Sequence, residues 1–416
     1  MPEQWWRGAL WIAVPLSTAS LACMPLLGMR PMIPVIAFWL FVLVLRACCD
    51  PVPITLREFR WTLFLALPFL FMVIDMFRGP ELLSGWKYTE RSSSLLLFPV
   101  GFLMLGAPAT DRLRGTMMDV FSMSALLLAF GANIGVAVAE VSPALEAEPG
   151  YAYNYRAMFG LVTGLHPPYA AYYFFLGALF QLLRSIDGAT YRTARRIATV
   201  LLFIAGVLLA SRMPLFAFLV AASLIAILRM PRKNALRTVL GAFGAVLLTI
   251  LLSPGMRQRM SEALHGQAAP ASQSEVTSTN IRLSLAHCAK ETIAEHWLLG
   301  TGQSEAQTTL DRCYRQFNIP LLLDGSYGTH NQILHWWLCF GVVGPVLFVI
   351  WFGVLLRHAW RQMDVAYVAF LVFLLLCMLT ENVLARQWGV VLFACFNALF
   401  VAGTLADKAP ARSPRT

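Results

Sequence analysis

Residues 31–49, PMIPVIAFWLFVLVLRACC, form an apolar run in which Arg46 is the one charged residue. A helix needs roughly 20 predominantly apolar residues to cross the hydrocarbon core of a bilayer. Similar runs recur along the 416-residue chain, which is 58% hydrophobic and 13% charged and has a mean hydropathy of +0.65. Soluble domains carry about 25% charged residues. The composition therefore excludes a soluble enzyme, a disordered chain and a disulfide scaffold.

The apolar runs predict an all-α polytopic membrane protein with about twelve transmembrane helices, because a helix satisfies its own backbone hydrogen bonds inside lipid. The predicted spans are roughly 8–28, 31–49, 61–77, 92–108, 114–139, 157–183, 197–210, 213–228, 238–253, 333–356, 365–384 and 388–406. The expected domains are helices 1–9 over 1–253, a partly helical periplasmic loop over 254–332, helices 10–12 over 333–406 and a cytoplasmic tail over 407–416. Within the loop, a helix is expected from Thr279 to Trp297.

The net charge of +10 indicates orientation in the membrane. When the loops are numbered alternately from an inside N-terminus, the inner loops carry about +11 and the outer loops about −1. This asymmetry is the one that the positive-inside rule favours. Both termini are therefore expected in the cytoplasm and the large loop on the outer side, where the chemistry is also expected. The basic surplus does not indicate a nucleic-acid partner.

The eight cysteines divide unevenly. Cys288 and Cys313 lie in the large outer loop, and the others fall in or beside predicted spans. If the outer compartment is oxidising, this pair could form a disulfide that closes about 25 residues. Two free thiols are the alternative.

Several basic residues lie at or near the outer ends of predicted spans. They are Lys87, Arg91, Arg156, Arg212, Arg282 and Arg386. One interpretation is that they snorkel to lipid headgroups. The other is that several arginines face one cavity and bind a phosphate or pyrophosphate, for which the planar guanidinium is suited. Arg212 is the sharpest case, because it lies between two apolar runs where an unpaired charge is costly. Glu381 and Asp75 are acidic counterparts near membrane depth, and for Asp75 a simple pair with an arginine is favoured.

The seven histidines show no metal-ligand spacing, so neither a metal site nor a cofactor is predicted. His330 begins the tenth predicted span, and a histidine there suits a general base at neutral pH, with Asn331 orienting it. A polar residue at a helix end is the alternative. His166 precedes Pro167 and Pro168 and marks a break within the sixth span, which is either structural or functional.

The segment Thr329-His330-Asn331-Gln332-Ile333-Leu334, followed by Phe340-Gly341-Val342-Val343-Gly344, resembles a signature of the O-antigen ligase/polymerase superfamily. These proteins are membrane glycosyltransferases of the GT-C type. Further matches follow in the order of the family: His166-Pro167-Pro168-Tyr169, Ser211-Arg212, Asn280-Ile281-Arg282, Leu298-Leu299-Gly300-Thr301-Gly302 and Glu381. The resemblance covers about 150–406. The chain length and the single large loop are similar to those of bacterial O-antigen ligases.

The resemblance implies an enzyme of lipopolysaccharide biosynthesis in the bacterial inner membrane, with its active site facing the periplasm. It implies an inverting, metal-independent transfer of O-antigen polysaccharide from undecaprenyl pyrophosphate to a sugar hydroxyl of lipid A–core. The implied catalytic base is His330. The implied pyrophosphate ligands are Arg212 and Arg282, with support from Lys87, Arg91 and Arg156. The implied supporting residues are Asn331, His166, Tyr169 and Glu381.

Other functions are open at this point. An O-antigen polymerase or a protein O-oligosaccharyltransferase would use the same donor, and the sequence separates these enzymes poorly from a ligase. A secondary transporter or flippase is the alternative without covalent chemistry, and about twelve helices with cytoplasmic termini fit it. Against a transporter stand the lack of a recognisable internal repeat and the polar outer loop of about 79 residues.

Overall fold

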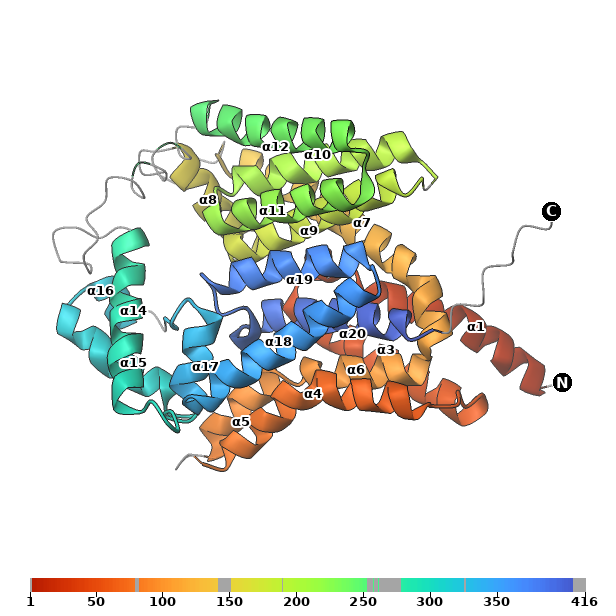
Figure 1. The fold of residues 1–416 in the computed structure, drawn as a ribbon, viewed down its shortest axis with the longest axis horizontal. Coiled ribbons are helices and arrows are strands. Elements are labelled where there is room, and N and C mark those ends of the chain that lie inside the picture. Colours follow the sequence, from red (N-terminus) through yellow and green to blue (C-terminus); the bar gives the residue numbers. More distant parts are fainter. Residues whose placement is uncertain are drawn as a thin grey trace.

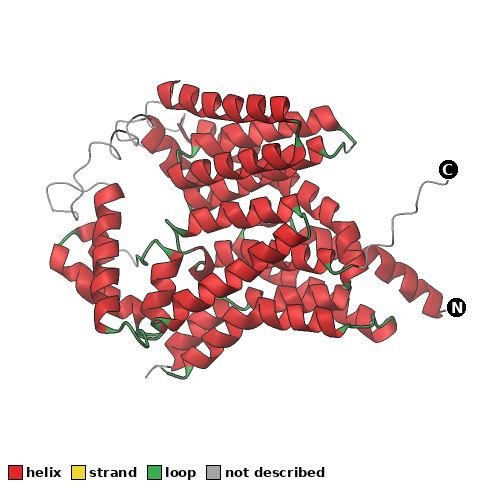
Figure 2. Ribbon diagram, in the orientation of Figure 1, coloured by secondary structure: helices red, strands yellow, loops and turns green. Residues whose placement is uncertain are grey.

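The computed structural model describes residues 2–78, 82–140, 151–188, 190–252, 257, 261, 278–324 and 327–406. These residues form helices and connecting loops, with no strand among them, which confirms the all-α prediction (Figure 2). In chain order the helices are α1 (Pro2–Leu21), α2 (Met24–Leu27), α3 (Met29–Cys49), α4 (Leu56–Met76), α5 (Leu82–Arg91), α6 (Ser94–Leu105), α7 (Ala107–Glu140), α8 (Tyr151–Thr163), α9 (Pro167–Ile186), α10 (Arg192–Leu208), α11 (Arg212–Arg229), α12 (Arg232–Leu252), α14 (Ser278–Glu295), α15 (Ala306–Tyr314), α16 (Pro320–Asp324), α17 (Gln332–Phe340), α18 (Val343–Arg361), α19 (Val365–Met378) and α20 (Gln387–Thr404).

Six helices of the described chain are long and apolar enough to cross a membrane: α3, α4, α7, α11, α18 and α20. Shorter apolar helical segments lie in α1, α6 and α19. Large apolar side chains such as Ile74, Ile134 and Val349 are exposed on these helices, as expected for surfaces that lipid covers. The protein is therefore an all-α polytopic membrane protein, and the count of about twelve spans stays a prediction.

The centre of the bundle is formed by α9, α19 and α20, in which most side chains are buried. α9 packs against α7, α10 and α11, and α20 packs against α6 and α7 (Figure 1). Aromatic rings fill the space between these helices. The ring of Phe396 lies 5.0 Å from that of Phe121 and 5.2 Å from that of Phe180, centroid to centroid. Aromatic pairs at such distances add to the energy of burial.

The sixth predicted span is broken, as the two prolines indicate. α8 ends at Thr163, and α9 begins at Pro167 after a short loop. Proline is well tolerated at the first position of a helix, where its missing N–H group is not needed. The break places the N-terminus of α9, with His166 as its N-cap residue, inside the bundle end where the candidate site lies.

Two other predicted spans are shorter than expected. The prediction of one helix over 333–356 is wrong, because α17 ends at Phe340 and α18 begins at Val343. Gly341 between them has a φ of +63°, a left-handed conformation that an α-helix cannot continue. The span predicted over 365–384 ends at Met378, and the connection from 379 to 386 is a loop with one short 3-10 helix, Val383–Ala385.

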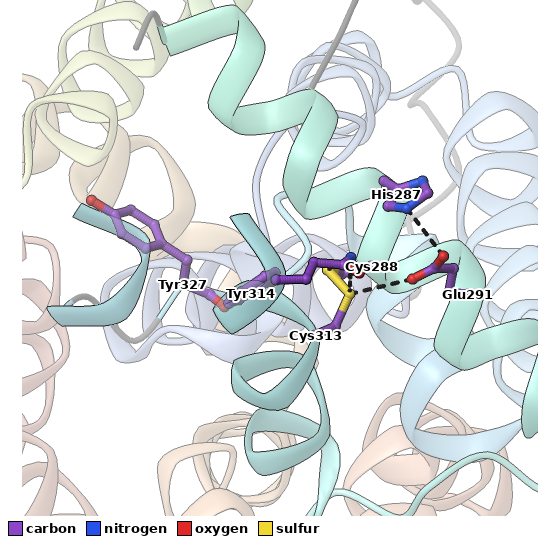
Figure 3. Close-up of a disulfide and its surroundings, with 7 residues drawn as sticks. His287, Cys288, Glu291, Cys313, Tyr314 and Tyr327 are labelled. Carbon is purple, nitrogen blue, oxygen red and sulfur yellow. Dashed lines mark hydrogen bonds and ion pairs between the residues drawn. A yellow bond between two sulfur atoms is a disulfide. The ribbon is translucent and has the colours of Figure 1, made fainter. Parts of the chain in front are cut away.

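Helices α14, α15 and α16 form a small unit at one end of the bundle, away from the N-terminus (Figure 1). The helix predicted from Thr279 to Trp297 is confirmed as α14. A disulfide between Cys288 and Cys313, with Cα atoms 5.7 Å apart, joins α14 to α15 (Figure 3). The predicted tail over 407–416 and nearly all of 254–277 lie outside the described residues.

The basic residues assigned to the two sides of the membrane lie at opposite ends of α9. Arg184, in the last turn of α9, contacts Asp119 at 2.8 Å, and Arg195 contacts the same carboxylate. His166 lies at the other end, beside the cations assigned to the outer side. Because a helix of 20 residues is about 30 Å long, roughly the thickness of the hydrocarbon core separates the two groups.

Candidate active site

A cavity with a volume of about 70 Å³ lies at the end of the bundle where α9 and α11 begin. Three arginines from distant parts of the chain line it: Arg156 of α8, Arg212 of α11 and Arg282 of α14. The acidic residue of the cavity is Glu381, from the loop that follows α19. The remaining lining residues are Pro168, Tyr172, Ser211, Met213, Pro214 and Thr380. Folding therefore brings together four of the residues that the sequence singles out.

The turn between α10 and α11 positions two of the arginines. Ala210 in this turn has a φ of +49°, which is uncommon for a residue that carries a Cβ atom. Arg156 donates hydrogen bonds to the carbonyl oxygen of Leu209 at 3.1 Å and to the hydroxyl of Ser211 at 3.3 Å. Arg212 then begins α11. Backbone outliers of this kind persist where surrounding contacts hold them, and they concentrate at functional sites.

His330 and Glu381 face each other across the site. The Nδ1 atom of His330 lies 3.1 Å from Oε2 of Glu381, and Nη2 of Arg282 lies 3.3 Å from Oε1. The alignment of the His330 contact is poorer than that of an ideal hydrogen bond, as is common for catalytic contacts without substrate. The Glu381 side chain is 10% exposed and that of His330 is 21% exposed. Water therefore screens this pair only weakly.

Hydrogen bonds between two loops hold His330 opposite Glu381. His330 has a φ of +49°, the second left-handed residue other than glycine at the site. The hydroxyl of Thr329 donates to Oδ1 of Asn382 at 3.1 Å, and the amide of Asn331 donates to the carbonyl oxygen of Leu379 at 3.1 Å. Oδ1 of Asn331 also accepts hydrogen bonds from the first backbone N–H groups of α17 and caps that helix. Asn331 thus acts on His330 through the backbone.

The charge state of Glu381 follows from its neighbours. Burial by itself would raise the pKa of this carboxyl, but contact with His330 and the positive charge of Arg282 outweigh burial and hold the pKa below its ordinary value. Glu381 is therefore a carboxylate at neutral pH. Because Nδ1 of His330 faces this carboxylate, Nε2 is the ring nitrogen left for a substrate proton.

The remaining predicted site residues are His166 and Tyr169 at the start of α9 and Lys87 and Arg91 on α5. The ring of His166 lies 6.1 Å from that of Tyr169, whose buried hydroxyl has no hydrogen-bond partner in the described chain. Lys87 and Arg91 are exposed on α5 and do not line the cavity. The guanidinium of Arg91 lies over the ring of Tyr88 in its own helix, 5.5 Å from the centroid. Lys87 and Arg91 thus lie outside the cavity that the three arginines line.

The cavity also contains residues that the sequence analysis does not select. Tyr172 and Thr380 line it, and Asn382 holds the His330 loop. For Tyr172 a signal exists, because positions three apart on a helix share a face and Tyr169 belongs to the recognised motif. Thr380 and Asn382 flank Glu381 and could have been selected with it.

The glycine motifs Gly300-Thr301-Gly302 and Gly341-Val342-Val343-Gly344 lie where two backbone segments make a close contact. The N–H groups of Thr301 and Gly302 donate to the carbonyl oxygens of Leu338 at 2.8 Å and Cys339 at 2.9 Å. A Cβ atom on Gly300 would lie 2.4 Å from the backbone nitrogen of Gly341. The segment after α14 is therefore fastened to the end of α17, the helix that follows His330.

Asp75 anchors the same segment. Its Oδ2 atom accepts a hydrogen bond from the backbone of Gln303 at 2.8 Å, and its Oδ1 atom lies 3.1 Å from Arg78. Arg78 in turn donates to the carbonyl oxygen of Leu299 at 2.6 Å. The interpretation of Asp75 as the partner of an arginine is confirmed. Among the described residues, no three His, Cys, Asp or Glu side chains form a group that could hold a metal ion.

The fold and the cavity define a polytopic membrane protein that gathers arginines around a histidine–carboxylate pair at one end of its helix bundle. A model of the O-antigen ligase family matches residues 197–349, the region that contains Arg212, Arg282 and His330. This match supports placing the chain in the O-antigen ligase/polymerase superfamily. No curated protein matches the chain.

Proposed function

We propose that the protein is an O-antigen ligase that transfers O-antigen polysaccharide from undecaprenyl pyrophosphate to a sugar hydroxyl of lipid A–core. The reaction takes place at the periplasmic face of the bacterial inner membrane. The observation that carries the proposal is the convergence of Arg156, Arg212 and Arg282 on one cavity whose carboxylate, Glu381, contacts His330.

The three arginines of the cavity are suited to bind the pyrophosphate of the lipid-linked donor. A cavity of about 70 Å³ has room for a phosphate-sized group, and a polysaccharide must lie outside it. When the glycosidic bond to the pyrophosphate breaks, negative charge grows on the leaving phosphate oxygen. Guanidinium groups already placed around that oxygen stabilise the charge without reorganisation. A glycosyl pyrophosphate is thus activated by the protein's own cations, and the proposed mechanism has no step that uses a metal ion or a nucleotide.

His330 is suited to act as the base that activates the acceptor hydroxyl. In the proposed step, Nε2 of His330 takes the proton of the acceptor hydroxyl while the hydroxyl oxygen attacks the anomeric carbon. The bond from that carbon to the pyrophosphate oxygen breaks, and its electron pair leaves with undecaprenyl pyrophosphate. One displacement from the opposite face inverts the anomeric configuration. Glu381 stabilises the imidazolium that forms, and general base assistance of this kind contributes typically 10²–10⁴-fold.

Transfer by the purified full-length protein tests the proposal. The substrates are an undecaprenyl-pyrophosphate-linked glycan and lipid A–core, and covalent transfer also separates a ligase from a transporter. We expect His330→Ala to abolish transfer without unfolding the protein. Arg212→Lys should lower transfer about 10- to 10³-fold, because a point charge does not reproduce the bidentate fork.

The matched control is Arg361→Lys, a change of the same kind on an exposed arginine in the last turn of α18, outside the cavity. It should leave transfer unchanged. Near-normal transfer by His330→Ala, or no transfer by the wild-type protein, would overturn the proposal.

A gene deletion separates the ligase from a polymerase. Loss of a ligase removes all polymer from lipid A–core, whereas loss of a polymerase leaves single repeat units attached.

A further inference from the structure

We propose that the hydroxyl group of Tyr172 donates a hydrogen bond to a phosphate oxygen of the lipid-linked donor, alongside the three arginines. The inference rests on the proposed function and extends its donor site by one neutral ligand. Tyr172 lies on α9, and its side chain is completely buried among protein atoms and lines the cavity. Its hydroxyl has no hydrogen-bond partner among the described residues.

An unpaired hydroxyl in such a place is energetically unfavourable. A buried donor left without a partner loses the hydrogen bonds that it makes with water in the unfolded chain, and such groups are rare in native proteins. Because Tyr172 lines the cavity, a group that occupies the cavity can supply the missing partner. The tyrosine O–H group therefore indicates that the occupant carries a hydrogen-bond acceptor.

The other charged groups of the cavity narrow the identity of that acceptor. Guanidinium groups have donors and no acceptors, so Arg156, Arg212 and Arg282 cannot accept from Tyr172. The carboxylate of Glu381 contacts His330 and Arg282 and accepts no hydrogen bond from Tyr172. An oxygen of an anionic ligand satisfies Tyr172 and the arginines together. A phosphate group offers several such oxygens, which suits a site with donors on more than one side.

The position of the hydroxyl is fixed by packing. The ring of Tyr172 meets that of Tyr169 edge-to-face at 5.3 Å and that of Phe373 at 6.2 Å, centroid to centroid. A donor held in this way needs no reorganisation when charge develops on the leaving oxygen. The hydroxyl should therefore contribute to binding of the pyrophosphate and to the rate of transfer.

The next residue provides a matched control. Tyr173 is also completely buried, and its hydroxyl also has no partner among the described residues. Its ring packs on Phe121 at 5.9 Å and does not line the cavity. Tyr172→Phe and Tyr173→Phe therefore remove the same atom from the same helix at equal burial, and they differ in whether the cavity is affected.

The experiment measures binding of undecaprenyl pyrophosphate, and of undecaprenol without phosphate, to the purified full-length protein. Transfer of glycan is measured in parallel. A hydrogen bond to a charged group is worth roughly 1.5–3 kcal/mol, so Tyr172→Phe should weaken pyrophosphate binding roughly ten- to hundredfold. Binding of undecaprenol should not change. Tyr173→Phe should bind both lipids within about twofold of wild type, the size of effect expected away from a site.

The outcomes separate this inference from the proposed function. If wild type transfers glycan, His330→Ala does not, and Tyr172→Phe binds undecaprenyl pyrophosphate like wild type, the inference is wrong and the ligase proposal stands. If no form transfers glycan but Tyr172→Phe alone binds the pyrophosphate more weakly, the phosphate site stands and the ligase proposal fails. Equal losses in Tyr172→Phe and Tyr173→Phe, or weaker binding of undecaprenol by Tyr172→Phe, would overturn the inference.

Discussion

The carboxylate of Glu381 lies between His330, 3.1 Å away at Nδ1, and Arg282, 3.3 Å away at Nη2. One buried carboxylate therefore contacts both the candidate base and a candidate phosphate ligand. Arg282 comes from α14, and the other two residues come from loops at the ends of α17 and α19. The proposed acceptor and donor halves of the site are thus joined through a single acidic side chain.

Glu381→Gln should lower the rate of transfer on the order of 10²–10⁴-fold, as does loss of the carboxylate from other histidine–carboxylate pairs. The amide keeps the shape of the side chain but cannot stabilise the imidazolium that forms when His330 takes a proton. The measurement is the rate of transfer at saturating donor. Glu291→Gln is the control, because Glu291 lies 3.1 Å from His287 on the exposed face of α14 (Figure 3). An equal loss in both variants would contradict the assignment.

Glu381 should also make the stability of the protein depend on pH in a defined direction. Its pKa in the folded protein lies below the ordinary value of 4.5, so the folded state binds the proton more weakly than the unfolded state does. The stabilisation is then complete above about pH 4.5 and is lost as the pH falls through the folded pKa. Thermal unfolding of wild type and Glu381→Gln in detergent measures this. The difference in Tm should shrink as the pH falls below about 4.5, and a difference that grows there would refute the assignment.

The positions of charges along the sequence predict which side of the membrane holds the site, and the resemblance predicts which arginines matter. The charge pattern alone does not place Arg91 outside the site, because Arg91 and Arg212 both lie near the end of an apolar run, and the resemblance gives Arg91 a supporting role. Tertiary packing separates them: the turn after α10 directs Arg212 into the cavity, whereas α5 leaves Arg91 exposed. Local sequence carries no information on that packing.

The helix break at Gly341 is a second feature that the sequence does not predict. Residues 333–356 are predominantly apolar throughout, so the pattern predicts one span. The backbone conformation of a single residue, Gly341, divides that span into two helices. The left-handed conformations of Ala210 and His330 are equally invisible in the sequence. Tertiary hydrogen bonds and helix ends impose them, and neither residue type favours that conformation.

The stability of α14 and α15, and with it the rate of transfer, should depend on the disulfide. Cys288 and Cys313 are 25 residues apart, and closing a loop of that length is worth about 3–4 kcal/mol in the entropic account. Tyr314, next to Cys313, donates from its hydroxyl to the carbonyl oxygen of Tyr327, three residues before His330 (Figure 3). Replacing both cysteines by serine should increase hydrogen exchange in α14 and α15 and lower transfer.

A control for the cysteine variant is Cys48→Ser, which changes an exposed free cysteine outside this loop and should have no effect. Mass spectrometry of the non-reduced protein gives a direct check of the bond. Two free thiols in protein recovered from the membrane would contradict the disulfide, and unchanged exchange in the double variant would contradict its role.

The backbone contact between Gly341 and the segment after α14 gives the last prediction. A Cβ atom on Gly341 would lie 2.1 Å from the carbonyl oxygen of Leu298, and the φ of +63° would strain it further. Gly341→Ala should therefore destabilise the protein by about 2–4 kcal/mol, and it should lower transfer because α17 begins next to His330. Gly353→Ala is the matched control, since Gly353 lies within α18 with no atom within 4 Å of the added Cβ. That change should stabilise the helix by roughly 0.5–1 kcal/mol. Thermal unfolding in detergent measures both, and a Tm for Gly341→Ala equal to that of Gly353→Ala would show that the close contact is absent.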